Sequence, residues 1–256
     1  MQAMGVPMAR DLTITQVLAD PDLHLWEHRA ESRDAVLVLS GVGTDPEVSP
    51  GHEFARSASG NGTRNVLFVA DPNRTWLNGP GLIEKIVDRF EDFVARCGSP
   101  RTVALGHSMG GFAALVLSGF TRLDTVLALA PQYSIHPGVV PDEHRWMEHR
   151  AKLTEFRIRD VAAHLDGVTD YVIVHGRHPR EAVQRDKFPV APNIRHFVLP
   201  RTHHDVPQKL KMAGVLAPFM KAVIDKRIKR ARLILQDNFG AVLRQPDDLT
   251  PEVGQC

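Results

Sequence analysis

Short apolar runs alternate with longer segments of helical periodicity along this chain. The alternation is typical of an α/β protein with a mainly parallel sheet, because helices connect successive buried strands. The apolar runs predict about eight strands in all. They are two edge strands within 12–30, and single strands at 35–39, 65–70, 103–105, 125–130, 171–175 and 196–199.

One segment has a pronounced helical pattern. Residues 81–97 place their apolar side chains on a single helical face, and Gly98 and Pro100 follow where such a helix would end. We therefore expect this helix to pack against the sheet. The apolar positions are Leu82, Ile83, Ile86, Val87, Phe90, Phe93, Val94 and Cys97.

Two further segments complete the expected organisation of residues 1–256 as a single domain. About forty residues separate the strand ending near 130 from the one starting at 171, which is longer than a bare crossover helix needs. We expect a small lid there, over residues 131–160 (the lid segment). The chain from 221 is basic at first and then polar, which predicts a C-terminal helix plus tail over 221–256. We interpret that helix as solvated or packed against another subunit, so an oligomer stays open.

Composition narrows the class of protein. The chain is 43% hydrophobic and 24% charged, and 31 basic residues against 30 acidic ones give a net charge of +1. This balance creates no general field for polyanions, so we expect no nucleic-acid partner. Arg10 and Asp11 stand where the apolar core of a signal peptide would lie. No stretch reaches the ~18 apolar residues needed to cross a bilayer, so we expect no membrane span. Cys97 and Cys256 cannot form a disulfide framework, which favours a cytoplasmic location.

The strongest candidate for chemistry is the segment 106–110, which reads GHSMG and matches G-x-S-x-G. A strand precedes it and a helix of small residues follows, which is the context this motif requires. A serine hydroxyl is a poor nucleophile at neutral pH, so it must be held beside a base, and a sharp strand-to-helix turn does this. The pattern predicts Ser108 as a nucleophile. A glycine-rich helix start with an incidental serine is the alternative.

On this motif and its continuation, GHSMGGFAALVLSGF, the chain resembles the α/β-hydrolases over most of residues 12–225. It also resembles a poorly characterised bacterial subgroup of hydrolases through Asp71, Pro72 and Trp76. The resemblance implies an α/β-hydrolase fold and a Ser, acid, His order along the chain. It further implies an ester or related acyl substrate and no metal or organic cofactor.

The resemblance places the base on the loop after the last strand, which reads RTHHDVP here. Family members commonly have Gly-His-Asp-Val at this point, which aligns His204 with the base and leaves His203 as its competitor. The acid is expected after the strand at 171–175, where the family has G-x-x-D and this chain has GRHPRE. Glu181 is the candidate, because its longer side chain can still reach the histidine. The alternatives left open are Asp186, Asp142, Glu143 or the absence of any carboxylate.

The elements around Ser108 suggest further roles. The backbone amide of Met109 lies at the helix start, and the loop SGVG after the strand at 35–39 lets the amide of Val42 approach, so these two are the expected oxyanion donors. Loops beyond the strand ends supply Trp76, Gln132 and Tyr133 as candidate substrate-binding residues. Ordinary packing is the alternative for each. Trp146 and Met147 in the lid segment are further candidate wall residues.

These features favour a serine hydrolase that cleaves a small-molecule or carbohydrate-linked carboxylic ester through an acyl-enzyme. An acyltransferase with the same residues is one alternative, and a catalytically degenerate hydrolase fold that acts as a binding subunit is another. A metal site in the lid segment is disfavoured, because His144 and His149 are five residues apart and do not share a helical face.

Overall fold

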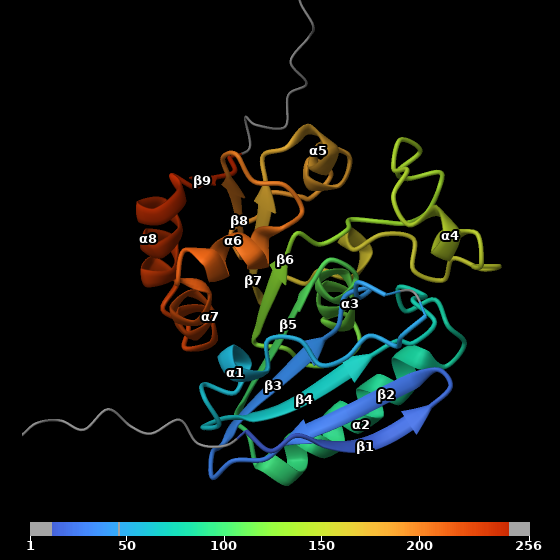
Figure 1. Ribbon diagram of the computed structural model, residues 1–256, viewed down its shortest axis with the longest axis vertical. Helices are drawn as coiled ribbons and strands as arrows, with labels where there is room; N and C mark the ends of the chain where they lie inside the picture. Colours follow the sequence, from blue (N-terminus) through green and yellow to red (C-terminus); the bar gives the residue numbers. More distant parts are fainter. Residues whose placement is uncertain (1–11, 46, 246–256) are drawn as a thin grey trace, which may run out of the picture.

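A nine-stranded sheet forms the centre of the computed structural model, which describes residues 12–45 and 47–245 (Figure 1). Its order is β1-β2-β4-β3-β5-β6-β7-β8-β9. The strands are β1 Thr15–Asp20, β2 Leu23–His28, β3 Asp34–Leu39, β4 Asn65–Ala70, β5 Arg101–His107, β6 Thr125–Leu129, β7 Asp170–Gly176, β8 Ile194–Leu199 and β9 Val242–Leu243.

The six central strands, from β4 through β8, are parallel, whereas β1 and β2 at one edge and β9 at the other pair antiparallel. The predicted α/β fold with a mainly parallel sheet of about eight strands is confirmed. The additional strand, β9, has two residues, which is too short for an apolar pattern to reveal.

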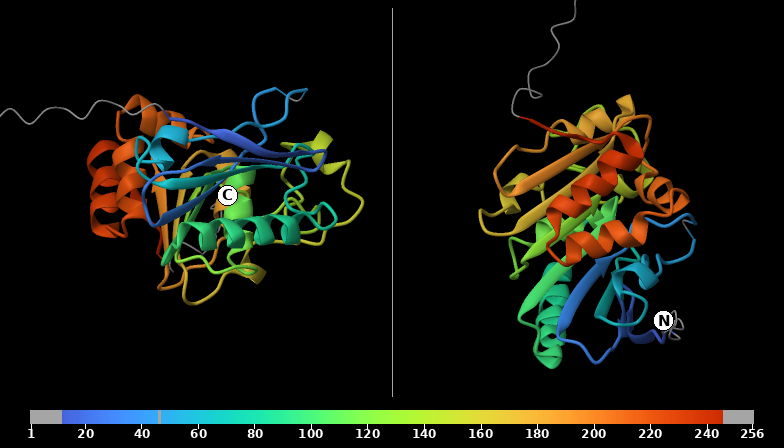
Figure 2. Two further views of the ribbon diagram at one scale, coloured as in Figure 1. Left: turned by 90° about the horizontal axis from the view of Figure 1, so that it is seen from below. Right: turned by 90° about the vertical axis from the view of Figure 1, so that its left-hand side faces the viewer.

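Helices cover both faces of the sheet (Figure 2). In β3, Ala35, Leu37 and Leu39 face α2 (Leu82–Cys97) and α3 (Met109–Leu117), while Val36 and Val38 face the opposite layer. This is why the central strands read as continuous apolar runs: each is buried on both sides. The opposite layer consists of α1 (Ala55–Ala58), α6 (Val206–Met212), α7 (Leu216–Ile224) and α8 (Ile228–Phe239).

The helix α2 matches its predicted pattern. Leu82, Ile83, Ile86, Phe90 and Phe93 are buried, and the helix ends at Gly98, whose φ of 57° allows its amide to bond back to the last turn. No helix within residues 12–45 and 47–245 combines the length and apolar character that crossing a membrane requires.

The basic segment from Lys221 differs from the single helix expected there. It is divided between α7 and α8 by a break in which Lys226 has a φ of 55°. Both helices pack their apolar residues against the sheet, for example Val223 and Leu235, which are fully buried. Hydrophobic burial therefore decides the path of this segment despite its charge. The predicted tail beyond 245 and the opening residues 1–11 lie outside the described residues.

The lid segment is mostly irregular and contains one short helix, α4 (Met147–Arg150). The 3₁₀ helix η1 (Ala162–His164) follows it before β7, and α5 (Pro179–Arg185) lies between β7 and β8. Figure 1 shows the lid segment extending to one side of the sheet around α4.

The turn between β5 and α3 brings backbone against backbone. A Cβ added to Gly110 would lie 2.0 Å from the Leu39 carbonyl oxygen, and one added to Gly106 would lie 2.3 Å from the Gly110 carbonyl carbon. Real Cβ atoms do not approach so closely, so α3 can start at this position only if both residues are glycine.

We therefore expect Gly110→Ala to destabilise the protein by about 4 kcal/mol or more, because the rigid Leu39 carbonyl cannot move aside. Gly98→Ala is the matched control, since its Cβ would meet open space and costs only about 1 kcal/mol from the positive φ. Chemical unfolding of both variants checks this. Equal stability of the two would contradict the packing argument.

Candidate active site

Ser108 occupies the turn between β5 and α3, with φ 56° and ψ −121°. Few residues other than glycine adopt such a backbone, and here it is maintained by the packing of the turn and by a hydrogen bond from the Ser108 amide to the Leu129 carbonyl at 2.9 Å. Ser108 is only 3% exposed. The strained turn directs its hydroxyl away from the helix and towards the loops beyond the strands.

Three predicted residues meet in one hydrogen-bonded chain. The Oγ of Ser108 lies 2.8 Å from Nε2 of His204, and Nδ1 of His204 lies 3.1 Å from Oε2 of Glu181. The structure thus brings together Ser108, Glu181 and His204, whose order along the chain is the Ser, acid, His order that the resemblance implies. The competitor His203 points elsewhere, because its ring stacks on His178 with centroids 3.8 Å apart.

Glu181 reaches His204 from the first turn of α5. His178 caps the start of this helix, because its side chain accepts from the Arg180 amide, and Pro179 occupies the first helical position. Burial raises the pKa of Glu181, but the hydrogen bond with His204 and the charges of His204 and Arg145 outweigh it and lower that pKa to about 2. The carboxyl group is therefore ionised at neutral pH.

The lid segment supplies the cation for this carboxylate. Arg145 donates through Nη1 to Oε1 of Glu181, and through Nε and Nη2 to the two oxygens of Glu143. The side chains of Glu143 and Glu181 are 4% and 3% exposed, so one guanidinium neutralises two buried carboxylates. Among the alternative acids, Asp142 is exposed and Asp186 is paired with Arg185 with its side chain 51% exposed.

His107, the residue before Ser108, anchors the loop that carries His204. Burial lowers the pKa of His107 to about 4, so its ring is neutral. Its Nε2 donates to the backbone carbonyl of His204 at 3.0 Å. The turn that presents Ser108 therefore also positions the backbone of its partner.

Gln132 and Trp76 lie on the other side of the hydroxyl. Gln132 donates through Nε2 to Oγ of Ser108 at 2.9 Å and accepts at Oε1 from the Trp76 indole N–H at 3.0 Å. Trp146 of the lid segment covers His204, with ring centroids 5.4 Å apart. Tyr133 packs its ring edge against Phe188, 5.4 Å between centroids. Contact of any of these residues with a substrate stays a prediction.

The loop after β3 meets the start of α3 beside the serine. Among the described residues, no acceptor is bonded to the amides of Val42 or Met109, so both are available to an oxyanion, and this role stays a prediction for each. The preceding amide, of Gly41, donates to Oε1 of Glu53 at 3.2 Å. Burial raises the pKa of Glu53 to about 7.

Arg74 fixes the same loop from the opposite side. It is 5% exposed and donates to the carbonyls of Val42, Asp45 and Val48, at 2.8 to 2.9 Å. Because each of these bonds ends on backbone, Arg74 determines the course of the loop whatever side chains the loop carries.

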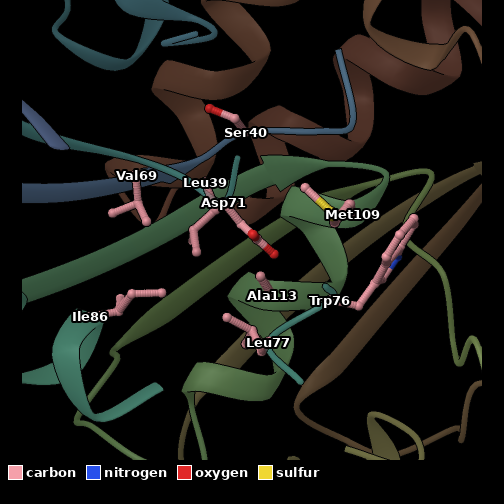
Figure 3. A pocket seen from close by; sticks show the side chains of 9 residues that line it. All are labelled: Leu39, Ser40, Val69, Asp71, Trp76, Leu77, Ile86, Met109 and Ala113. Atoms are coloured by element: carbon pink, nitrogen blue, oxygen red, sulfur yellow. The ribbon is translucent and has the colours of Figure 1, made fainter. Parts of the chain in front are cut away.

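A small cavity lies beside the turn (Figure 3). It has about 20 Å³ of room for the centre of a water-sized sphere, enough for about one water molecule. Two of its lining residues, Ser40 before the loop with Val42 and Met109 at the start of α3, place it next to both candidate oxyanion donors. The residues that line it are Leu39, Ser40, Val69, Asp71, Trp76, Leu77, Ile86, Met109 and Ala113.

Sequence reasoning missed the polar residues that support this site, namely Arg74, Arg145 and Glu53. Arg74 lies two residues before Trp76, and Arg145 lies directly before Trp146. Both tryptophans were candidate wall residues, so this proximity in sequence was the available signal. Within the described residues, His, Cys, Asp and Glu form no group of three or more that could hold a metal ion.

Neither a protein-family model nor a curated protein matches this sequence. Solved structures do resemble it. Est1E from Butyrivibrio proteoclasticus aligns with a TM-score of 0.55 at 14% identity, over 86% of this chain and 99% of that one. The chain therefore has the α/β-hydrolase fold, as the sequence resemblance predicted.

Two further structures share this fold. The capsule O-acetyltransferase of Neisseria meningitidis serogroup A aligns with a TM-score of 0.56 at 12% identity, over 82% of this chain and 94% of that one. FphF, a fluorophosphonate-binding serine hydrolase of Staphylococcus aureus, aligns with a TM-score of 0.51 at 11% identity, over 81% and 97%. The fold thus occurs in both a hydrolase and an acyltransferase.

The geometry predicts that Glu181→Gln slows labelling of Ser108 by a fluorophosphonate by about 100-fold or more, because the carboxylate that orients His204 and stabilises its cation is lost. Asp186→Asn is the control, since Asp186 follows closely in sequence but is paired with Arg185, and it should label within about twofold of the unmodified protein. The reverse pattern would assign the acid to Asp186.

Proposed function

We propose that this protein is a serine esterase that cleaves a small-molecule or carbohydrate-linked carboxylic ester through an acyl-enzyme. The observation that carries the proposal is the hydrogen-bonded chain from Ser108 through His204 to Glu181, at 2.8 and 3.1 Å. Such a chain activates a serine by giving its proton an acceptor and by stabilising the resulting imidazolium.

In the proposed reaction, His204 takes the proton of Ser108 as its Oγ attacks the ester carbonyl carbon. The amides of Val42 and Met109 donate to the oxyanion, and Glu181 stabilises the charged ring. His204 then gives the proton to the leaving alcohol. Water repeats the sequence on the acyl-enzyme, and the carboxylic acid leaves. No step requires a cofactor.

The size of the cavity beside Met109 supports a short acyl group. Because only about 20 Å³ is open to the centre of a water-sized sphere, the cavity accommodates little more than a methyl or ethyl group. The walls are mostly apolar and buried, which suits an alkyl chain.

Acyl transfer to an alcohol is the second candidate, favoured by the fold shared with the capsule O-acetyltransferase. The same residues would serve, with an acceptor hydroxyl in place of water. Product analysis with an added acceptor alcohol separates the two reactions, since only a transferase gives the new ester in preference to the free acid.

Replacing the nucleophile tests the mechanism. Ser108→Ala should lower turnover of p-nitrophenyl acetate by about 1,000-fold or more and abolish fluorophosphonate labelling, because no other residue replaces the attacking oxygen. Ser118→Ala, at the buried end of the same helix, is the control and should keep both. If the unmodified protein neither labels nor hydrolyses esters under conditions where known serine hydrolases do, the fold serves binding instead.

Acyl-chain selectivity tests the role of the cavity. Across p-nitrophenyl esters, kcat/KM should be highest for acetate or propionate and fall with longer chains, because a longer chain must displace buried side chains. Ile86→Val removes a methyl group from the cavity wall and should shift the preference towards the longer ester by several-fold. Ile83→Val is the control on the same helix, since Ile83 is buried but does not line the cavity. An equal shift in both variants would place the acyl group elsewhere.

A further inference from the structure

We propose that Gln132 is a catalytic residue that donates a hydrogen bond to the nucleophilic oxygen, and that Trp76 is the positioning residue that orients it. This inference rests on the proposed function and gives these two residues a role beyond forming a wall of the substrate site. Its basis is the pair of hydrogen bonds that joins the Trp76 indole, the Gln132 carboxamide and the Ser108 hydroxyl.

The chemistry of tryptophan determines the orientation of the carboxamide. An indole N–H can only donate, so the atom of Gln132 that lies 3.0 Å from it must be the carbonyl oxygen. The amide nitrogen then faces Oγ of Ser108 at 2.9 Å. A flipped carboxamide would oppose two N–H groups, which is unfavourable.

The carboxylate of Glu181 determines the direction of the hydrogen bonds on the other side of Oγ. An ionised carboxylate can only accept, so in the neutral ring of His204 Nε2 carries no proton and accepts from Oγ, whose own hydrogen is free because Gln132 donates to that oxygen. The proton of the neutral ring lies on Nδ1, where it donates to Glu181. Trp76 at one end of this series of hydrogen bonds, and Glu181 at the other, are thus both compatible with the reactive tautomer of His204.

Burial and backbone anchoring keep Gln132 in place. Trp76 and Gln132 are each 1% exposed, so water does not compete for their bonds. The carbonyl of the preceding residue, Pro131, accepts from Nε2 of His175 at 2.9 Å, and His175 is fully buried. Both the backbone and the side chain of this position are therefore held, which is the preorganisation that electrostatic catalysis requires.

The hydrogen bond gains strength when negative charge develops on Oγ. As the Oγ–H bond breaks and the proton moves to His204, Gln132 donates to an increasingly negative oxygen, and bonds to charged acceptors are stronger than neutral ones. The charge then passes to the substrate carbonyl oxygen as the bond from Oγ to carbon forms.

Deacylation reverses these events. His204 takes a proton from water as the water oxygen bonds to the acyl carbon, the bond between that carbon and Oγ breaks, and its electron pair returns to Oγ. His204 then returns a proton to Oγ. Gln132 again donates to the oxygen that carries the charge, so the bond accelerates both acyl transfers.

Gln132→Met tests this, because it keeps a side chain of similar length without the amide. We expect the second-order rate of fluorophosphonate labelling and the kcat for p-nitrophenyl acetate to fall by about 10- to 100-fold. Asn65→Leu is the control, since Asn65 is also a 1%-exposed amide with hydrogen bonds to backbone, but lies at the start of β4. It should lower stability while the rates per folded molecule stay unchanged.

A double-mutant cycle tests the positioning role of Trp76. Trp76→Phe keeps an aromatic ring but removes the N–H, and should lower kcat by several-fold because the carboxamide is no longer oriented. In the Gln132→Met background the same substitution should change kcat by less than about twofold. A purely structural role would reduce kcat by the same factor in both backgrounds.

The outcomes separate this inference from the proposed function. If Gln132→Met labels and turns over at the rates of the unmodified protein while Ser108→Ala is inactive, the serine mechanism stands and the donor role is wrong. If Trp76→Phe lowers kcat equally with and without Gln132, the positioning role is wrong. If the unmodified protein is itself unreactive, the proposed function fails first.

Discussion

The close approach of α3 to the ends of β3 and β5 is the constraint on which the rest of the site depends. Because the Gly110 backbone lies against the Leu39 carbonyl, the chain can pass from strand to helix only through a strained residue. That residue is Ser108, and its conformation sends the hydroxyl towards the loops while the following amide, of Met109, faces the same space. Helix packing in the core thus determines where chemistry can occur.

Much of the fold was predictable because its determinants are local in sequence. The strand at 65–70 and the helix α2 coincide with their predicted ranges almost residue for residue, since continuous apolar runs and a single apolar face each reflect burial directly. The turn at residues 106–110 was recognisable for the same reason: strand, glycines and helix are consecutive in sequence. His204 followed from its place after the last predicted strand.

The supporting residues were not predictable from local pattern, because contacts between distant segments create them. The ambiguity over the acid is an example: Glu181 reaches His204 only because His178 caps the start of α5 and because Arg145, 36 residues earlier, neutralises the buried carboxylate. Arg74 and Gln132 likewise make contacts across the fold, with backbone carbonyls and with the Ser108 hydroxyl. The break between α7 and α8 lay within a basic run whose charge obscured its apolar contacts with the sheet.

Arg145 also constrains how a molecule can reach the serine. Glu143 belongs to the lid segment and would move with Arg145, but an outward movement of the segment would separate Arg145 from the buried carboxylate of Glu181, at a cost of about 3 kcal/mol or more. The ion pair between Arg145 and Glu181 therefore opposes an outward movement of the lid segment.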